Sequence, residues 1–213
     1  MAYTKNDIKR LCRGRTPEQQ MAIKYFLGGG GCFSSGLSDQ QYEQMVFSIA
    51  RGTDFKARAL NKIGLDESQV NEIAPVYFEG YYFDEKSTYA KCGNDGKWRS
   101  SAYQVSWLFF SSTQVYVYQY TYHMDEDGRK ESTEEYFYRD ITNFSTSSDT
   151  VEKTVLEKVN CKGEATYGHR NVNMNRFALV VPGDKFYCSM EQTDYTERAI
   201  QGMKAKLREK KGY

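Results

Sequence analysis

Three basic residues in one short stretch carry the first chemical possibility. Lys91, Lys97 and Arg99 all fall within the nine residues KCGNDGKWR. Lysine and arginine side chains that lie close together bind phosphate groups through charge-assisted hydrogen bonds. The stretch therefore predicts an anion-binding loop, although Asn94-Asp95-Gly96 at its centre fits an ordinary turn equally well.

Nucleophilic catalysis would require a cysteine or serine beside one of the two histidines, His123 and His169. A pair formed by Cys161 and His169 would fit the loop-like stretch 160–173, but the usual role of such a cysteine is that of a small hydrophobic residue. The spacing of Cys, His and acidic residues indicates no metal site, and we expect no cofactor. The sequence thus leans against an enzyme.

A regular tyrosine stripe marks the segment Gln114–Asp140, which has the pattern of a β-hairpin. Tyrosine occupies every second position of its first arm: Tyr116, Tyr118, Tyr120 and Tyr122. Alternation of this kind places all four rings on one face of a strand. Such a stripe can stack on nucleic-acid bases, but no basic residues interleave with it, so we expect half-buried rings.

The turn of this hairpin sets its register. Asp127-Gly128 is a common turn dipeptide. A two-residue turn would pair Tyr118 with Phe137, and a four-residue turn would pair Tyr116 with Phe137. Either register predicts Phe137 on the tyrosine face and the valines of the first arm on the opposite face.

Composition narrows the class of protein. The net charge of the 213 residues is +1, which argues against non-specific binding of nucleic acid. Five widely spaced cysteines without a CxxC motif are typical of reduced thiols, so we expect a cytoplasmic location. The longest apolar run, Trp107–Phe110, is too short to cross a membrane. The first residues lack the apolar region of a signal peptide.

The predicted elements that position these residues change from helices to strands at about residue 75. Residues 1–75 have a helical pattern, with capping boxes at Thr16 and Ser38 and a stop at Gly64. The expected helices are 18–27, 39–50, 54–63 and 66–73.

From residue 76 the pattern changes to strands. The expected strands are 76–83, 103–110, 114–123, 130–139, 151–159, 175–181 and 185–190. Pro182-Gly183-Asp184 predicts a tight turn between the last two. A final helix should begin near Asp194, capped with Glu197, with an apolar stripe of Ile200, Met203 and Leu207.

Seven antiparallel strands followed by an amphipathic helix predict an α+β protein: a sandwich or partly open barrel capped at one end. This order, together with Tyr138-Arg139-Asp140-Ile141 and the closing strand pair, resembles the pleckstrin-homology (PH) superfold in its bacterial PH-like and GRAM-like variants. The resemblance covers residues 76–210 and implies that Lys91, Lys97 and Arg99 correspond in form to a phosphoinositide-binding pattern. The expected domains are a helical region, 1–75, and a PH-like β-domain, 76–213.

We therefore expect an intracellular, non-enzymatic binding or scaffolding module. Its ligand would be a protein segment or an anionic lipid headgroup. In a PH-like sheet, a peptide would bind at an exposed strand edge near the final helix. The alternatives are an enzyme that uses Cys161 and His169, and a single-stranded nucleic-acid binder that uses the tyrosine stripe.

Overall fold

A computed structural model describes residues 3–28, 36–84, 86–159 and 165–212 of this α+β protein. Its helices are α1 (Lys5–Cys12), α2 (Pro17–Leu27), α3 (Asp39–Gly52), α4 (Phe55–Ile63), the 3₁₀ turn η1 (Glu67–Gln69) and α5 (Asp194–Lys211). Its strands are β1 (Val76–Tyr82), β2 (Ala90–Cys92), β3 (Trp98–Ser100), β4 (Ala102–Phe110), β5 (Gln114–His123), β6 (Arg129–Phe137), β7 (Asn143–Val159), β8 (Ala165–Val181) and β9 (Asp184–Ser189).

Capping residues begin the helices, as the sequence predicts for α2 and α3. The Thr16 hydroxyl accepts a hydrogen bond from the Gln19 backbone N–H, and the Gln19 side chain accepts one from the Thr16 N–H. Gly64 ends α4 with a φ of 79°, a conformation that glycine adopts without strain. A capping box at Thr4 also starts α1, a helix that the sequence did not predict.

Two helix predictions need correction. The expected helix over 66–73 is only the 3₁₀ turn η1, because the chain joins the end of the sheet: the Glu72 N–H donates to the Phe110 carbonyl. The cap of α5 is Thr193 with Thr196, one residue earlier than expected.

In the described parts of the chain nine strands form two sheets, so the prediction of a seven-strand sandwich is wrong. One sheet has the order β1-β4-β5-β6, and the other has the order β3-β2-β7-β8-β9. All pairs are antiparallel except β2 with β7. The two unpredicted strands, β2 and β3, flank the turn within KCGNDGKWR, and arms of three residues are too short to show alternation.

The tyrosine hairpin β5–β6 has a longer turn than either predicted register. Tyr116 lies opposite Glu135, and Phe137 lies opposite Gln114. The difference arises because Met124 and Asp125 are buried, with the Met124 N–H donating to the Ser101 carbonyl. The predicted faces are confirmed, since Gln114 and Phe137 share the face of the tyrosine stripe.

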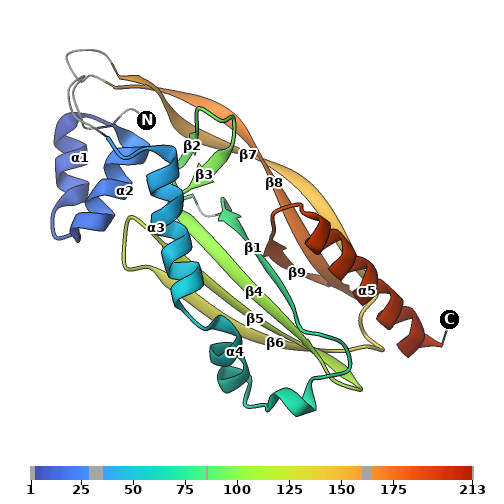
Figure 1. Ribbon diagram of the computed structural model, residues 1–213. Helices are drawn as coiled ribbons and strands as arrows, with labels where there is room; N and C mark the ends of the chain where they lie inside the picture. The colour runs from blue at the N-terminus through green and yellow to red at the C-terminus, as the bar shows by residue number, and fades with distance from the viewer. Residues whose placement is uncertain (1–2, 29–35, 85, 160–164, 213) are drawn as a thin grey trace.

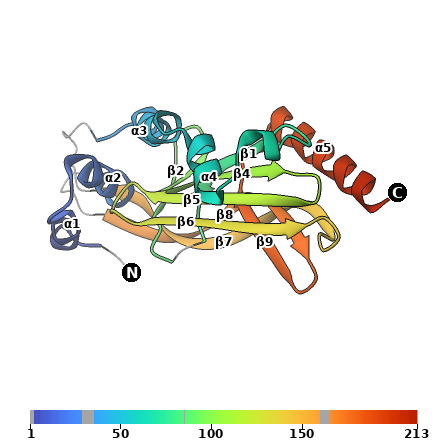
Figure 2. The same cartoon turned by 90° about the horizontal axis from the view of Figure 1, so that it is seen from below.

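Both faces of the first sheet are covered, which gives the molecule three layers. Figure 2 shows α3 and α4 on one side of β4–β6 and the second sheet on the other side. The core beneath the helices contains Tyr118, Tyr120 and Tyr122 together with Phe26 and Tyr42. Two of the buried hydroxyls in this core have backbone acceptors: Tyr42 donates to the Ser100 carbonyl at 2.7 Å and Tyr122 to the Val46 carbonyl at 2.8 Å.

The core between the two sheets is capped by α5. It contains Val115 and Val117 from the far face of the hairpin, and Phe78 stacks on Phe177 across the sheets at 4.6 Å between ring centroids. The predicted apolar stripe of α5 packs into this core: Ile200, Met203 and Leu207.

The long hairpin β7–β8 twists strongly along its length (Figure 1). Near α5 its buried side chains are Phe144 and Phe177, whereas farther along they are Val155 and Val172, which the strand pairing places on the opposite face. The face that is apolar at one end of the hairpin is consequently polar and exposed farther along.

Candidate binding site

Two of the three basic residues predicted to bind an anion, Lys91 and Arg99, form ion pairs with acidic side chains of the protein itself. The Arg99 side chain is 1% exposed, and its guanidinium donates to both Asp95 carboxylate oxygens at 2.9 and 2.8 Å and to Glu43 at 2.8 Å. Hydrogen bonds from Arg99 hold the pKa of the Asp95 carboxyl well below its usual range.

Lys91 also has partners within the protein. Its Nζ lies 3.7 Å from the Asp39 carboxylate and 3.7 Å from the centroid of the Tyr25 ring. Lys97, in contrast, is exposed on the turn. Lys91 and Arg99 thus join β2 and β3 to helices α2 and α3, and anion binding by the three residues stays a prediction.

The other two predicted sites are the catalytic pair Cys161 and His169 and the tyrosine stripe. Cys161 lies outside the described residues, and the His169 side chain is 62% exposed with its Nδ1 3.2 Å from Glu152. The catalytic pair therefore stays a prediction. The tyrosine stripe offers little ring surface for stacking, because Tyr118, Tyr120 and Tyr122 are buried beneath the helices.

A groove of about 580 Å³ separates α5 from the hairpin β7–β8. Its floor is apolar and consists of Met190 and Ile200, which belong to the core between the sheets. Its walls are polar. The hairpin supplies Thr146, Ser147, Ser148 and Asn175, and α5 with the preceding residues supplies Gln192, Glu197, Arg198, Gln201 and Lys204.

The hairpin wall of the groove continues as a ladder of uncharged polar pairs. The Ser148 hydroxyl donates to the Asn175 side-chain carbonyl at 2.7 Å, and the Thr150 hydroxyl donates to that of Asn173 at 2.8 Å. These residues alternate with the buried Val172 and Met174 on β8. The alternation fixes the polar side chains on the solvent face beside the groove.

One edge of β7 is open along the same stretch. Within the described residues, β7 pairs with β8 along its whole length, but its other edge pairs only where Val155 meets Ala90 of β2. Residues 143–150 therefore present unpaired backbone N–H and C=O groups to any strand that approaches.

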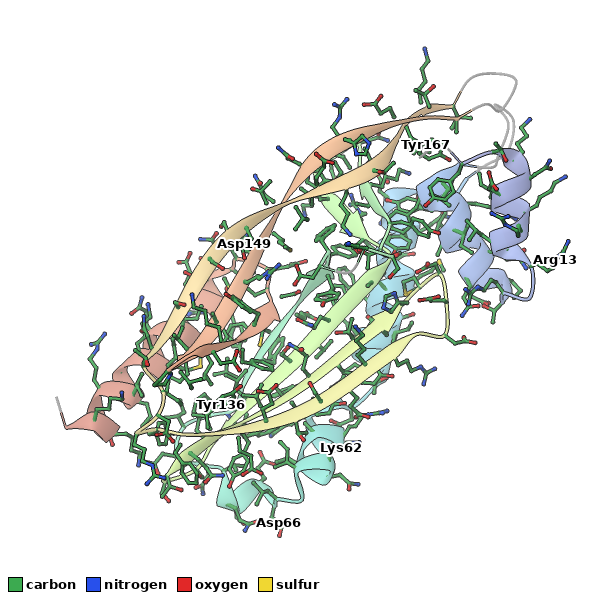
Figure 3. The ribbon with its side chains drawn as sticks, turned by 180° about the vertical axis from the view of Figure 1, so that it is seen from behind. Arg13, Lys62, Asp66, Tyr136, Asp149 and Tyr167 are labelled. Carbon is green, nitrogen blue, oxygen red and sulfur yellow. The ribbon has the colours of Figure 1, made fainter. Side chains whose placement is uncertain are left out.

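The edge strand β6 and the open part of β7 differ in charge. The edge strand β6 carries Arg129, Lys130, Glu131, Glu134 and Glu135, and charges of this kind discourage the addition of another strand. Residues 143–150, with the sequence NFSTSSDT, contain a single charged residue, Asp149. Asp149 lies 3.4 Å from Arg176 and is labelled on β7 in Figure 3. The open part of β7 lacks the protection that β6 has.

The sequence alone did not reveal this groove. The predicted fifth strand begins at residue 151, so the sequence pattern assigns no structure to the Ser/Thr-rich segment before it. A signal was nevertheless present, since Asn171, Asn173 and Asn175 occupy alternate positions around Val172 and Met174. That period indicates a strand with one polar face.

Comparison with known proteins finds no matching family model, no significant match among curated proteins and none among solved structures. Within the described residues, no group of histidine, cysteine and acidic side chains is arranged to hold a metal ion. No helix in the described part of the chain has the length and apolar character needed to span a membrane.

Proposed function

We propose that this protein is a non-enzymatic binding module that recognises an extended protein segment in the groove between β7 and α5. The observation that carries the proposal is the coincidence of an open strand edge, residues 143–150, with an adjoining groove that has an apolar floor. An extended peptide would add a strand to this edge through backbone hydrogen bonds, and its alternate side chains would enter the groove.

The groove walls are suited to such a ligand. Hydroxyl and amide groups from Thr146, Ser148 and Asn175 offer both donors and acceptors without strong charge. Met190 and Ile200 supply apolar contact for one side chain of the ligand. Glu197, Arg198 and Lys204 line the α5 side, where they would select among charged ligand residues.

The resemblance to PH-like domains supports the same location. The seven strands expected from the sequence correspond to β1 and β4–β9, and the amphipathic helix α5 follows them. For such a sheet, the sequence predicts a peptide site on an exposed strand edge near the final helix. The open edge of β7 has this position.

A peptide library displayed on phage, with the full chain as bait, tests the proposal. A selected peptide is labelled and its affinity measured by fluorescence polarisation. Gln201→Trp places a large ring in the groove and should weaken binding by about tenfold or more, since the loss of contacts in one pocket is worth at least 1.4 kcal/mol. Nuclear magnetic resonance of the bound protein should show altered and exchange-protected amides in residues 143–150.

Arg208→Trp is the matched control. Arg208 is an exposed residue of the same helix that does not line the groove. This variant should bind the peptide with the affinity of the wild type. Equal losses in the two tryptophan variants, or amide changes confined to β6, would contradict the proposed site.

A further inference from the structure

A second pocket, of about 450 Å³, lies between α1 and α2. Figure 1 shows these helices at the end of the molecule away from α5, so the pocket is separate from the groove described above. Its lining residues are Lys5, Ile8, Lys9, Cys12, Arg13, Gln20 and Lys24.

The rim of the pocket is basic on both sides. Lys5 and Lys9 are four residues apart on one face of α1, and Arg13 is the residue that caps the C-terminal end of the helix. Lys24 faces them from α2. None of the described residues that line the pocket is acidic. The nearby carboxylate of Asp7 is engaged elsewhere, with Thr4 and Arg10.

The floor of the pocket adds no negative charge. Ile8 and Cys12 are buried there, at 5% and 9% exposure. Burial raises the pKa of the Cys12 thiol and outweighs the opposing effect of the Lys24 charge, so the sulfur stays neutral at physiological pH. The geometry thus concentrates cations around an uncharged floor.

Like charges spaced four residues apart destabilise a helix. The partial negative charge at the C-terminal end of α1 offsets some of this repulsion for Lys9 and Arg13. The charge at the end of α1 does not offset the repulsion from Lys24, because Lys24 belongs to α2 and faces the same pocket. An anionic ligand bound between the helices would neutralise the charges of Lys9, Arg13 and Lys24 together.

We propose that the pocket between α1 and α2 binds a ligand that carries two or more phosphate groups. Phosphate oxygens accept charge-assisted hydrogen bonds from lysine and arginine, and the spread of the cations over two helices suits several phosphates better than one. A free polyphosphorylated molecule and the headgroup of a phosphorylated lipid share this chemistry. This inference is independent of peptide binding at β7.

Two probes distinguish these sources. Tripolyphosphate, titrated into the full chain in a calorimeter at low salt, tests for a free ligand. Co-sedimentation with phosphatidylcholine vesicles that contain phosphatidylinositol 4-phosphate, compared with pure phosphatidylcholine vesicles, tests for a headgroup. We expect saturable binding of at least one of the two phosphate probes, and failure of both would overturn the proposal.

The triple variant Lys9→Ala, Arg13→Ala, Lys24→Ala should weaken binding of that probe about tenfold or more, because it removes three charged donors. Its melting temperature without ligand should equal or exceed that of the wild type, since repulsion is relieved. The control is Lys158→Ala, Lys185→Ala, Lys211→Ala, which removes the same charge outside the pocket and should bind within about twofold of the wild type. Equal weakening in both triple variants would show non-specific attraction and overturn the assigned site.

Discussion

At the scale of single residues, charged side chains join the helical region to the sheets. Arg99 of β3 pairs with Glu43 of α3, and Lys91 of β2 lies beside Asp39 at the start of the same helix. Glu131 of β6 joins α4 to the first sheet in a similar way. Its carboxylate accepts hydrogen bonds from Arg58 at 2.8 and 3.0 Å and from the Tyr118 hydroxyl at 2.8 Å.

The Glu131 contacts predict an acid-sensitive contribution to stability. Hydrogen bonds from Arg58 lower the pKa of Glu131 to about 2 in the folded protein. Because the folded pKa lies below the unfolded one, the contribution is complete above about pH 4.5 and is lost as the pH falls through 2. Glu131→Gln should lower the free energy of unfolding at pH 7 by about 2 kcal/mol.

The measurement is urea denaturation of the wild type and the variant at pH 7 and at several lower pH values. The difference between the two proteins should shrink as the pH falls below 4.5. Lys62→Gln is a useful control. Lys62 belongs to α4 (Figure 3), and its Nζ lies 3.7 Å from the Glu131 carboxylate, so this substitution should lower the free energy of unfolding by less than Glu131→Gln does. A difference that is constant over this pH range would contradict the assignment.

At the scale of elements, backbone packing decides what each glycine tolerates. Gly202 lies within α5, and a Cβ at this position would meet no atom within 4 Å. A Cβ on Gly80 of β1 would lie 3.2 Å from the backbone nitrogen of Met190. The first glycine only weakens its helix, whereas the second permits the close approach of β1 to the segment that leads into α5.

These two positions predict opposite effects of the same substitution. Gly202→Ala should raise the free energy of unfolding by about 0.5–1 kcal/mol, because alanine lowers the entropy of the unfolded chain and favours the helix. Gly80→Ala should lower it, because the backbone of Met190 is held by its hydrogen bond to Asn175. Thermal denaturation followed by circular dichroism measures both changes, and a shift of the same sign in the two variants would contradict this account.

At the scale of the whole molecule, the helical region and the first sheet share one core. Phe26, Tyr42 and Phe55 of the helices pack with the tyrosine stripe of β5. The division into domains 1–75 and 76–213 stays a prediction. This core contains residues from both sides of the expected boundary. The first sheet depends on the helices to cover its tyrosine face.

Removal of residues 1–75 should therefore uncover a large aromatic surface. The fragment 76–213 is expected to bind the dye 1-anilinonaphthalene-8-sulfonate strongly and to unfold at a lower temperature than the full chain. The full chain should unfold in a single transition. A fragment as soluble and as stable as the full chain would show that the shared core contributes little.

Local signals made much of this fold predictable. Capping residues and the left-handed Gly64 defined the ends of helices, and period-two alternation gave β5 its observed bounds, Gln114–His123. Secondary-structure prediction failed where a strand was very short or where its order depended on contacts with a distant part of the chain. β2 and β3 have three residues each, and the first part of β7 is rich in serine and threonine and is ordered by its pairing with β8.

The sequence by itself determined the α+β class, the faces of the tyrosine hairpin and the amphipathic final helix, because each depends on spacing within one element. Only the tertiary structure decided what these elements expose. It buried the tyrosine stripe beneath the helices, gave Arg99 internal partners and placed the open edge of β7 beside α5. Those outcomes depend on contacts between residues far apart in the chain, which no local pattern encodes.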